Sequence, residues 1–254
     1  MNGALVFARK EVREILHTWR IWVLPAIMLF FAASGPFVAR FTPQIVGAVG
    51  GTALGHLVLP TPTYLDAYGG WVKNLSQITL FALIIIYGGI VSSELKGGTA
   101  LLVLTKPLSR TAFVVVKVVV NCAFVAIVLC AGTLVTWAIT AGVFGTAPAG
   151  PLWSAAAVWL VLAVLYIALL TFLSVAIGSA AGASGAGIGA FAVLSIASIW
   201  KPLSDYSPAG LAGQAASLAT RGTSPSALWP VLTSLAVSVI LVVGAAAAFR
   251  RKEL

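Results

Sequence analysis

Residues 94–117 read ELKGGTALLVLTKPLSRTAFVVVK and separate two long apolar segments. This stretch is one of three places where charged residues gather along the chain, together with the first twenty residues and the C-terminal end. A charged interruption between two apolar segments of spanning length is typical of a loop that joins two transmembrane helices. The stretch therefore predicts a membrane protein, and what contacts it becomes the central question of function.

Composition supports this class. The chain has 60% hydrophobic and 8% charged residues and a mean hydropathy of +1.07, whereas a soluble domain carries about 25% charged residues. Its 254 residues suffice for roughly six spans of about 20 residues each, with no room for a further soluble domain. We therefore expect an all-α integral membrane protein with a single transmembrane domain over residues 1–254.

Apolar runs bounded by charged residues, glycine and proline predict where the spans lie. The glycines and prolines between residues 40 and 77 predict a surface connection, and His56 and Asp66 within it form only a weak candidate metal pair. Lys117 falls two turns inside a span, where we expect its stem to reach the interface. The six predicted spans are residues 21–38, 75–92, 111–142, 152–177, 183–200 and 228–249.

Three segments that lie outside these spans or overlap the start of one have patterns of their own. Residues 1–20 place apolar residues on one helical face and basic residues, Arg9 and Arg13 among them, on another, with Trp19 at the end, which predicts an amphipathic interfacial helix. A cleaved signal peptide is the alternative, although two glutamates in its charged part are atypical. The glycine-rich residues 178–189 predict close helix packing, or alternatively a hinge. Residues 201–227 have a centre too short to span and predict a re-entrant or interfacial helix on the outer side.

The basic residues are distributed unevenly about the predicted spans. By the positive-inside rule, the richer side, which holds both termini and residues 94–117, is cytoplasmic. Because the bases flank apolar runs, the net charge of +9 favours topology over nucleic-acid binding. Eleven bases lie on one side, Arg9, Lys10, Arg13, Arg20, Lys96, Lys106, Arg110, Lys117, Arg250, Arg251 and Lys252, and four on the other, Arg40, Lys73, Lys201 and Arg221.

Several functions are excluded by missing motifs. The sequence has no G-x-x-x-x-G-K-[ST], so the chain lacks a phosphate-binding Walker A loop, and it has no catalytic His or Cys signature. We therefore expect no catalytic, cofactor or metal residues in this chain. The predicted spans contain no ionisable group at depth; their polar side chains, such as Asn121, Thr136, Thr171 and Ser195, either bond along and between helices or line a weakly polar pathway for amphipathic or apolar cargo.

Residues 94–110 have the features of a short cytoplasmic helix between two spans. A nearly uncharged run follows Gly98 and Thr99, Pro107 stops it, and Ser109 is placed to cap the next helix. The run presents Leu101 and Leu102 to something other than bulk water. A partner protein and the lipid interface are the two alternatives.

Over residues 94–117 the sequence resembles a known family, the type-2 ABC transporter permeases. These proteins are membrane subunits of many bacterial exporters. The residues that carry the resemblance look like the family's pattern E-x-x-x-G-T-x-x-L-L-x-x-P-x-S-R-x-x-F-x-x-x-K. The amphipathic N-terminus, the six spans and the outer segment extend it over nearly the whole chain. In this sequence the motif residues are Glu94, Gly98, Thr99, Leu101, Leu102, Pro107, Ser109, Arg110, Phe113 and Lys117.

The resemblance implies a coupling helix, residues 94–110, that docks on a separate cytoplasmic ATP-binding subunit. Two permease chains, expected as a homodimer, would pair with two ATPases, which bind ATP and Mg²⁺, in the plasma membrane of a bacterium. The N-terminal connecting helix, with Arg9, Arg13 and Trp19, would contact the same partner. Glu94 and Arg110 would be interface or hinge residues; the other implied interface residues are Gly98, Thr99, Leu101, Leu102, Pro107 and Ser109.

Two other functional classes are weighed against this hypothesis. A stand-alone channel or membrane assembly scaffold is the main alternative, because the sequence lacks its own energy-coupling residue. A membrane enzyme is a third, but no cluster of residues supports it. The sequence does not identify the cargo.

Overall fold

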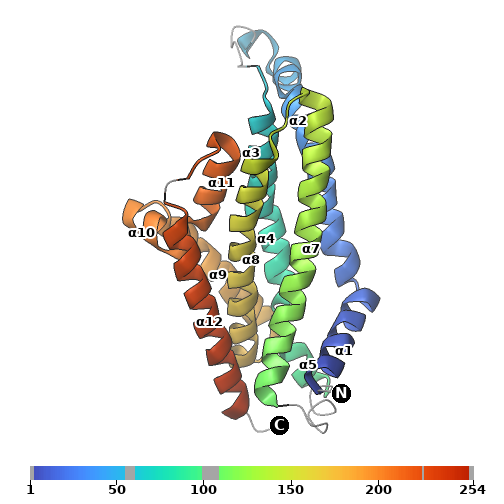
Figure 1. Cartoon of the computed structure of the whole chain (residues 1–254), viewed down its shortest axis with the longest axis vertical. Helices are drawn as coiled ribbons and strands as arrows, with labels where there is room; N and C mark the ends of the chain where they lie inside the picture. Colours follow the sequence, from blue (N-terminus) through green and yellow to red (C-terminus); the bar gives the residue numbers. More distant parts are fainter. Residues whose placement is uncertain (1–2, 55–60, 99–108, 225, 252–254) are drawn as a thin grey trace.

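The computed structural model describes residues 3–54, 61–98, 109–224 and 226–251, and for residues 47–54 it describes the backbone alone. Over these ranges the chain is helical, without strands, and its long helices lie side by side in one elongated bundle (Figure 1). The helices are α1 Gly3–His17, α2 Arg20–Leu54, α3 Tyr64–Asn74, α4 Leu80–Tyr87, α5 Ser92–Lys96, α7 Arg110–Phe144, α8 Ala149–Ile177, α9 Ala180–Ala197, α10 Lys201–Tyr206, α11 Leu211–Arg221 and α12 Leu228–Arg251.

Six helical segments of the described chain are long and apolar enough to cross a membrane. This confirms the predicted fold class at the level of an all-α, multi-pass membrane protein. The fifth span begins three residues earlier than predicted, because Ser179 caps α9 with a bond from the Gly182 amide at 3.2 Å. The six segments are Arg20–Val46, Tyr64–Lys96, Arg110–Phe144, Ala149–Ile177, Ala180–Ala197 and Leu228–Arg251.

The predicted end of the first span near Val38 is wrong, because α2 continues to Leu54 with Pro25, Pro36 and Pro43 inside it. A proline removes one backbone donor, but a membrane helix tolerates it when a neighbouring helix satisfies the freed carbonyl. Pro36 leaves the carbonyl of Ala32 without its usual donor, and the hydroxyl of Thr136 on α7 donates to that oxygen at 3.4 Å. The tertiary contact thus compensates for the break that the sequence suggests.

The second span also begins earlier than predicted, at Tyr64. Thr63 and Asp66 form a capping box that fixes the start of α3. A π-helical turn, Leu75–Thr79, joins α3 to α4. The surface connection expected over residues 40–77 is therefore mostly helix, and Asp66 has a local structural role. His56 lies outside the described residues.

Glycine permits close packing where the sequence favoured it. A Cβ on Gly187 of α9 would lie 2.7 Å from the Leu170 side chain of α8, and one on Gly88, just after α4, would lie 1.9 Å from the Ser184 hydroxyl of α9. Gly178, at φ +71°, ends α8 in the left-handed conformation that glycine adopts without strain. Most of the glycine-rich stretch therefore lies in the packed helix α9.

The central helix of the bundle is α8, which packs against α12, α11, α7, α9 and α4. Its Trp159 and Tyr166 are almost fully buried. In the segment 201–227, α11 lays Leu211, Ala215 and Ala219 against α8 and α3. The short helix predicted there exists, and its apolar face packs on protein.

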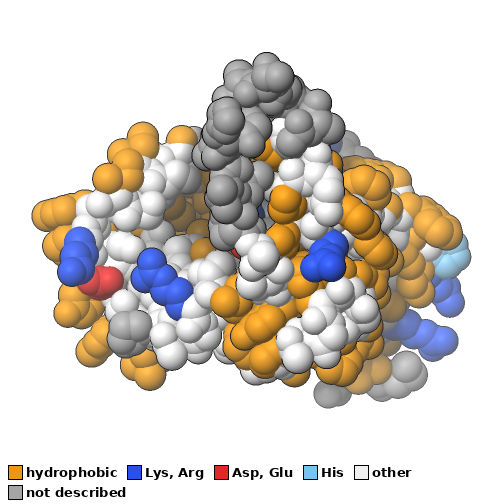
Figure 2. Space-filling model, turned by 90° about the horizontal axis from the view of Figure 1, so that it is seen from above, with side chains coloured by type: hydrophobic (Ala, Val, Ile, Leu, Met, Phe, Trp, Pro, Cys, Tyr) orange, Lys and Arg blue, Asp and Glu red, His pale blue; other side chains and the backbone are white. Residues whose placement is uncertain are grey.

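The two ends of the bundle differ. The N-terminal helix α1, the short helix α5 and the last turns of α12 lie at one end, and the start of α3 and the α7–α8 turn lie at the other (Figure 1). Seen from this second end, basic and acidic side chains are few and scattered, and one acidic patch lies against a basic one (Figure 2). The first end is where the described charges concentrate, and it holds the candidate site.

Candidate functional site

Charged side chains from α1, α5 and α7 meet inside the end of the bundle that carries α1. We call this group the buried charge cluster. It has three carboxylates and two ammonium groups, so its formal charge is negative by one. Its members are Lys10, Glu11, Glu14, Glu94 and Lys117.

Lys117 of α7 has the most buried charge of the cluster, with a side chain that is 0% exposed. Its Nζ donates to both carboxylate oxygens of Glu11, at 3.0 and 3.1 Å, and lies 3.1 Å from Oε1 of Glu94. The expectation that the Lys117 stem reaches the interface is therefore wrong. The ammonium group points into the bundle because two carboxylates compensate for its loss of hydration there.

Lys10 of α1 contacts all three carboxylates. Its Nζ lies 2.6 Å from Glu14 and 3.1 Å from Glu11, and it also bonds to Oε1 of Glu94. Oε1 of Glu94 is thus shared by Lys10 and Lys117, whereas its buried Oε2 has no hydrogen-bond partner among the described residues. The two lysines and Glu94 tie α1, α5 and α7 together at one point.

The sequence of α1 explains how the helix docks. Phe7, Glu11 and Ile15 recur every fourth residue and form its buried face, which packs against α7. The ring of Phe7 stacks on Phe113 of α7 at 4.9 Å, and Phe113 stacks on Phe249 of α12 at 5.2 Å. One aromatic stack and the adjacent ion pairs therefore join α1, α7 and α12.

The ion pairs shift the pKa of Lys10 and the pKa of Glu14, the two half-buried members of the cluster on α1. Burial alone lowers the pKa of Lys10, but the hydrogen bonds from its ammonium to Glu14 and Glu94 outweigh this effect and raise the pKa above its ordinary value. Burial alone raises the pKa of Glu14, but its bond with Lys10 and the positive charge of Lys117 lower it below its ordinary value. Both groups stay charged across the neutral range.

The three glutamates also fit the donor set of a metal site, because one carboxylate oxygen of each lies within 4.8 Å of the others. Lys10, however, places its ammonium against all three. A divalent cation at this point would have to displace it. Ion pairing with Lys10 and Lys117 accounts for the gathering of the carboxylates.

Glu94 is held in place by the local structure of α5. The hydroxyl of Ser174 on α8 accepts from the backbone amides of Val91 and Ser92, at 3.1 and 2.9 Å, and donates to the Ser92 hydroxyl. These bonds satisfy amides left free where the chain breaks between α4 and α5. The start of α5 is thereby fixed against the central helix.

The chain enters α7 through a second fixed point. The Ser109 hydroxyl accepts from the Ala112 amide at 3.1 Å, which confirms the predicted cap. Arg110 donates to the carbonyls of Phe249 and Arg250 at the end of α12, at 3.4 and 3.0 Å. A guanidinium group at a helix C-terminus satisfies carbonyls that have no partner within the helix.

Comparison with known protein families gives a match for most of the chain. The family model described as a protein of unknown function, DUF2705, matches residues 60–254. The chain belongs to the DUF2705 family. No curated protein gives a significant match. The DUF2705 match includes Glu94, Arg110 and Lys117, whereas α1 and its three members of the buried charge cluster precede it.

Apart from Ser109 and Arg110 at the start of α7, the predicted partner-contact residues of this DUF2705 member fall into three groups. Glu94 is buried in ion pairs within its own chain, which agrees better with the hinge role than with an interface role. Gly98 follows α5 at φ +70°, and Arg9, Arg13 and Trp19 are exposed at the same end of the bundle. Thr99, Leu101, Leu102 and Pro107 lie outside the described residues.

The four candidate pathway residues are not brought together. Thr171 bonds to the carbonyl of Ile167 on its own helix at 2.7 Å, Thr136 to Ala32 of α2, and the Asn121 amide to the Lys117 carbonyl. Ser195 is exposed on α9. For the three buried residues, the structure favours the expected alternative of bonding along and between helices.

Sequence reasoning missed the roles of Lys10, Glu11, Glu14 and Lys117, and it placed Glu94 at an interface or hinge. A signal was present in the spacing, since Lys10 and Glu14 form an i,i+4 pair. Glu11 lies between Phe7 and Ile15 on the same helical face. A glutamate flanked by apolar residues on a helix and a lysine inside an apolar segment are complementary, and each needs a partner when buried.

Proposed function

We propose that this chain is the permease subunit of an ATP-driven ABC transporter, an exporter of amphipathic or apolar cargo powered by a separate cytoplasmic ATP-binding subunit. The chain itself is not catalytic in this proposal; ATP and Mg²⁺ bind the partner. Two copies of the chain and two ATPases form the complex in the plasma membrane of a bacterium, with both termini of each chain cytoplasmic.

One observation carries the proposal. The chain is fixed to neighbouring helices on both sides of residues 99–108. Val91 and Ser92 bond to Ser174 of α8, and Arg110 at the start of α7 bonds to the end of α12. Glu94 on one side and Lys117 on the other meet in the buried charge cluster. A force applied to the segment between them would therefore reach α1 and α7 directly.

The exposed surface at this end supports docking of a protein. Arg9 and Arg13 are exposed on α1, while Lys10 and Glu11 of the same helix are engaged inside the bundle. The outward bases are thus available to a partner with acidic residues, and the inward charges keep the helix in place. Charge complementarity of this kind fixes partner choice and register.

Co-expression with a Walker-motif ATPase and reconstitution into vesicles test the proposal. The complex should export an amphipathic fluorescent cargo only when ATP is supplied. Arg9→Glu with Arg13→Glu should weaken co-purification of the ATPase, and Leu101→Asp should have the same effect. Arg221→Glu is the matched control, because Arg221 is exposed at the end of α11, away from α1.

Two results would contradict the proposal. ATP-independent flux through vesicles that contain this chain alone would favour the stand-alone channel. Unchanged ATPase binding and transport in both the double charge reversal and Leu101→Asp would remove the assigned docking surface.

A further inference from the structure

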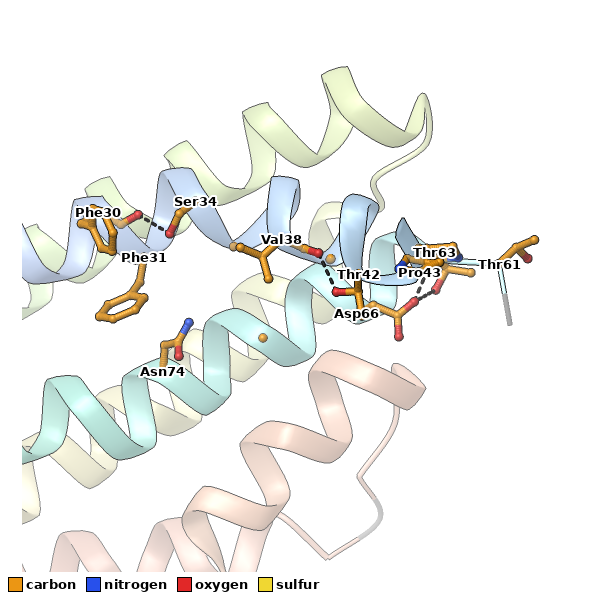
Figure 3. A pocket seen from close by; sticks show the side chains of 14 residues that line it. Phe30, Phe31, Ser34, Val38, Thr42, Pro43, Thr61, Thr63, Asp66 and Asn74 are labelled. Atoms are coloured by element: carbon orange, nitrogen blue, oxygen red, sulfur yellow. Dashed lines mark hydrogen bonds between the residues drawn. The ribbon is translucent and has the colours of Figure 1, made fainter. Parts of the chain in front are cut away.

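A groove of about 800 Å³ lies between α2 and α3, in the half of the bundle away from α1 (Figure 3). It exists because small residues face each other there: Gly35 and Ala39 on α2 and Gly70 on α3. A Cβ added to Gly35 or Gly70 would meet nothing within 4 Å. The two helices thus leave a volume within the range of about 300–1,000 Å³ that is usual for small-molecule sites.

The groove is aromatic at one end, where the amide of Asn74 and the hydroxyl of Ser34 also lie, and carries an acidic group at the other (Figure 3). The rings of Phe30 and Phe31 lie at one end, and Thr42, Thr63 and Asp66 lie at the other (Figure 3). The polar end is the one nearer the start of α3. An occupant that satisfies both ends must itself be amphipathic.

At the polar end, no described lining residue offsets the negative charge of Asp66. Asp66 is exposed, and its Oδ2 accepts two bonds from Thr63, at 2.7 Å from the amide and 3.0 Å from the hydroxyl. Neither donor is charged, and no Lys or Arg is among the described residues that line the groove. The neighbouring base on α2, Arg40, lies over the Phe144 ring of α7 instead.

A backbone carbonyl adds to this polarity. In a regular helix the amide of residue 43 would donate to the carbonyl of Ala39, but Pro43 has no N–H. Ala39 and Pro43 both line the groove. The carbonyl that loses its donor therefore belongs to a residue that lines the groove, and a ligand that donates N–H bonds would replace that donor.

We infer that the α2–α3 groove binds an amphipathic cation, with an ammonium group at Asp66 and an apolar body along Phe30, Phe31 and Val38. Charge selects a cation, the carbonyl and hydroxyl groups select a hydrogen-bond donor, and the aromatic end takes the hydrocarbon. Binding is a property of this chain alone. The view that the bound molecule is transported cargo rests on the function proposed above.

The test measures equilibrium binding to the purified full chain in nanodiscs of zwitterionic lipid. Radiolabelled dodecylammonium and the neutral analogue dodecanol are the probes, and binding to empty nanodiscs is subtracted. Dodecylammonium should bind saturably, and Asp66→Asn should weaken it about fivefold, a factor typical of one lost charge contact at an exposed carboxylate. The affinity for dodecanol should stay the same.

Asp205→Asn is the control, because Asp205 on α10 accepts a bond from Ser226 and does not line the groove. Gly35→Leu and Gly70→Leu should fill the groove and abolish binding of both probes. Equal dodecylammonium affinity in Asp66→Asn and the parent chain would overturn the inference, as would full binding in both leucine variants.

Folding of each variant is checked by size-exclusion elution and helicity. If the leucine variants fail to fold, the comparison of Asp66→Asn with Asp205→Asn decides, because asparagine keeps the acceptor that caps α3. No ATPase is present in this assay, so failure of the binding inference and failure of the proposed transport function are distinguished.

Discussion

Lys117 of α7 and Glu11 of α1 form a two-pronged ion pair, with Nζ 3.0 and 3.1 Å from the two carboxylate oxygens and both side chains shielded from solvent. The pair closes a loop of 106 positions in the sequence and attaches the N-terminal helix to the third span. Burying two charges costs free energy that their attraction offsets only when both are present. The docked position of α1 against α7 therefore depends on both Glu11 and Lys117.

Replacing Lys117 by methionine should strongly destabilise the protein. Glu11 would keep its buried charge with only Lys10 nearby, and loss of one partner of a buried pair costs about 3–5 kcal/mol. The midpoint of heat-induced unfolding in detergent should fall on the order of 10 °C for a chain of this size. Lys96→Met, at an exposed lysine of α5, is the control; equal midpoints for the two variants would contradict the role of Lys117.

Glu11→Gln and Lys117→Met together should cost less than the sum of the two single changes. The double variant leaves neither charge buried without its partner, so the coupling energy should be on the order of 1–3 kcal/mol. A double-mutant cycle on unfolding midpoints measures it. Additive effects would show that the two side chains act independently despite their contact.

Hydropathy and charge alone predict six apolar helices and the richer basic end. The local residue types also predict the cap at Ser109, since a local hydroxyl satisfies a local amide. They do not predict that α2 passes through Pro36, because the compensating donor, Thr136, comes from another helix. Local sequence carries no information on that contact.

The buried charge cluster could not be predicted for the same reason, because its contacts join different helices. The sequence places Lys117 inside an apolar helix, but whether its ammonium turns to the interface or inward depends on which face of α1 lies against α7. That choice is made by Phe7 stacking on Phe113 as much as by the charges. Sequence spacing indicates that a partner is needed without identifying it.

Docking of α1 should be independent of pH across the neutral range and weaken in acid. The pKa of Glu14 is lowered on folding, so its stabilisation is present above the ordinary value of 4.5 and is lost as pH falls through the lowered value. The pKa of Lys10 is raised, so its contribution is complete below 10.5 and is lost only at higher pH.

A spin label at Leu16→Cys, with Cys122 and Cys130 replaced by alanine, reports the mobility of α1. The spectrum should stay constant between pH 4.5 and pH 10.5. Below pH 4.5 it should show a more mobile label. Glu14→Gln should show a more mobile label already at neutral pH and a smaller change in acid. An identical acid response in both proteins would exclude Glu14 as the titrating group.

Gly132→Ala should destabilise the contact between α7 and α3. A Cβ at this position would lie 2.7 Å from the ring of Trp71, which is 1% exposed and cannot move away. Overpacking of this kind costs about 1–3 kcal/mol. Gly142→Ala on the same helix, where a Cβ meets nothing within 4 Å, should be neutral or slightly stabilising. Unfolding midpoints of the two variants provide the comparison.

Ser174→Ala should loosen the break between α4 and α5. The serine hydroxyl accepts from two backbone amides, Val91 and Ser92, which are buried on the segment that leads to Glu94. Each buried donor left unsatisfied costs about 1–3 kcal/mol. The free energy of unfolding should therefore fall by more than it does for a typical surface substitution. Thr171→Ala is the matched control on the same helix, because within the described part of the chain its hydroxyl bonds to the carbonyl of Ile167 alone.

Hydrogen exchange at Val91 and Ser92 provides a local readout. Both amides should exchange faster in Ser174→Ala and stay protected in Thr171→Ala. Because Glu94 follows these amides within one helical turn, its ion pairs with Lys10 and Lys117 should loosen as well, and spin labels on α1 should gain mobility. Faster exchange with an unmoved α1 would mean that the buried charge cluster holds its geometry without the Ser174 anchor.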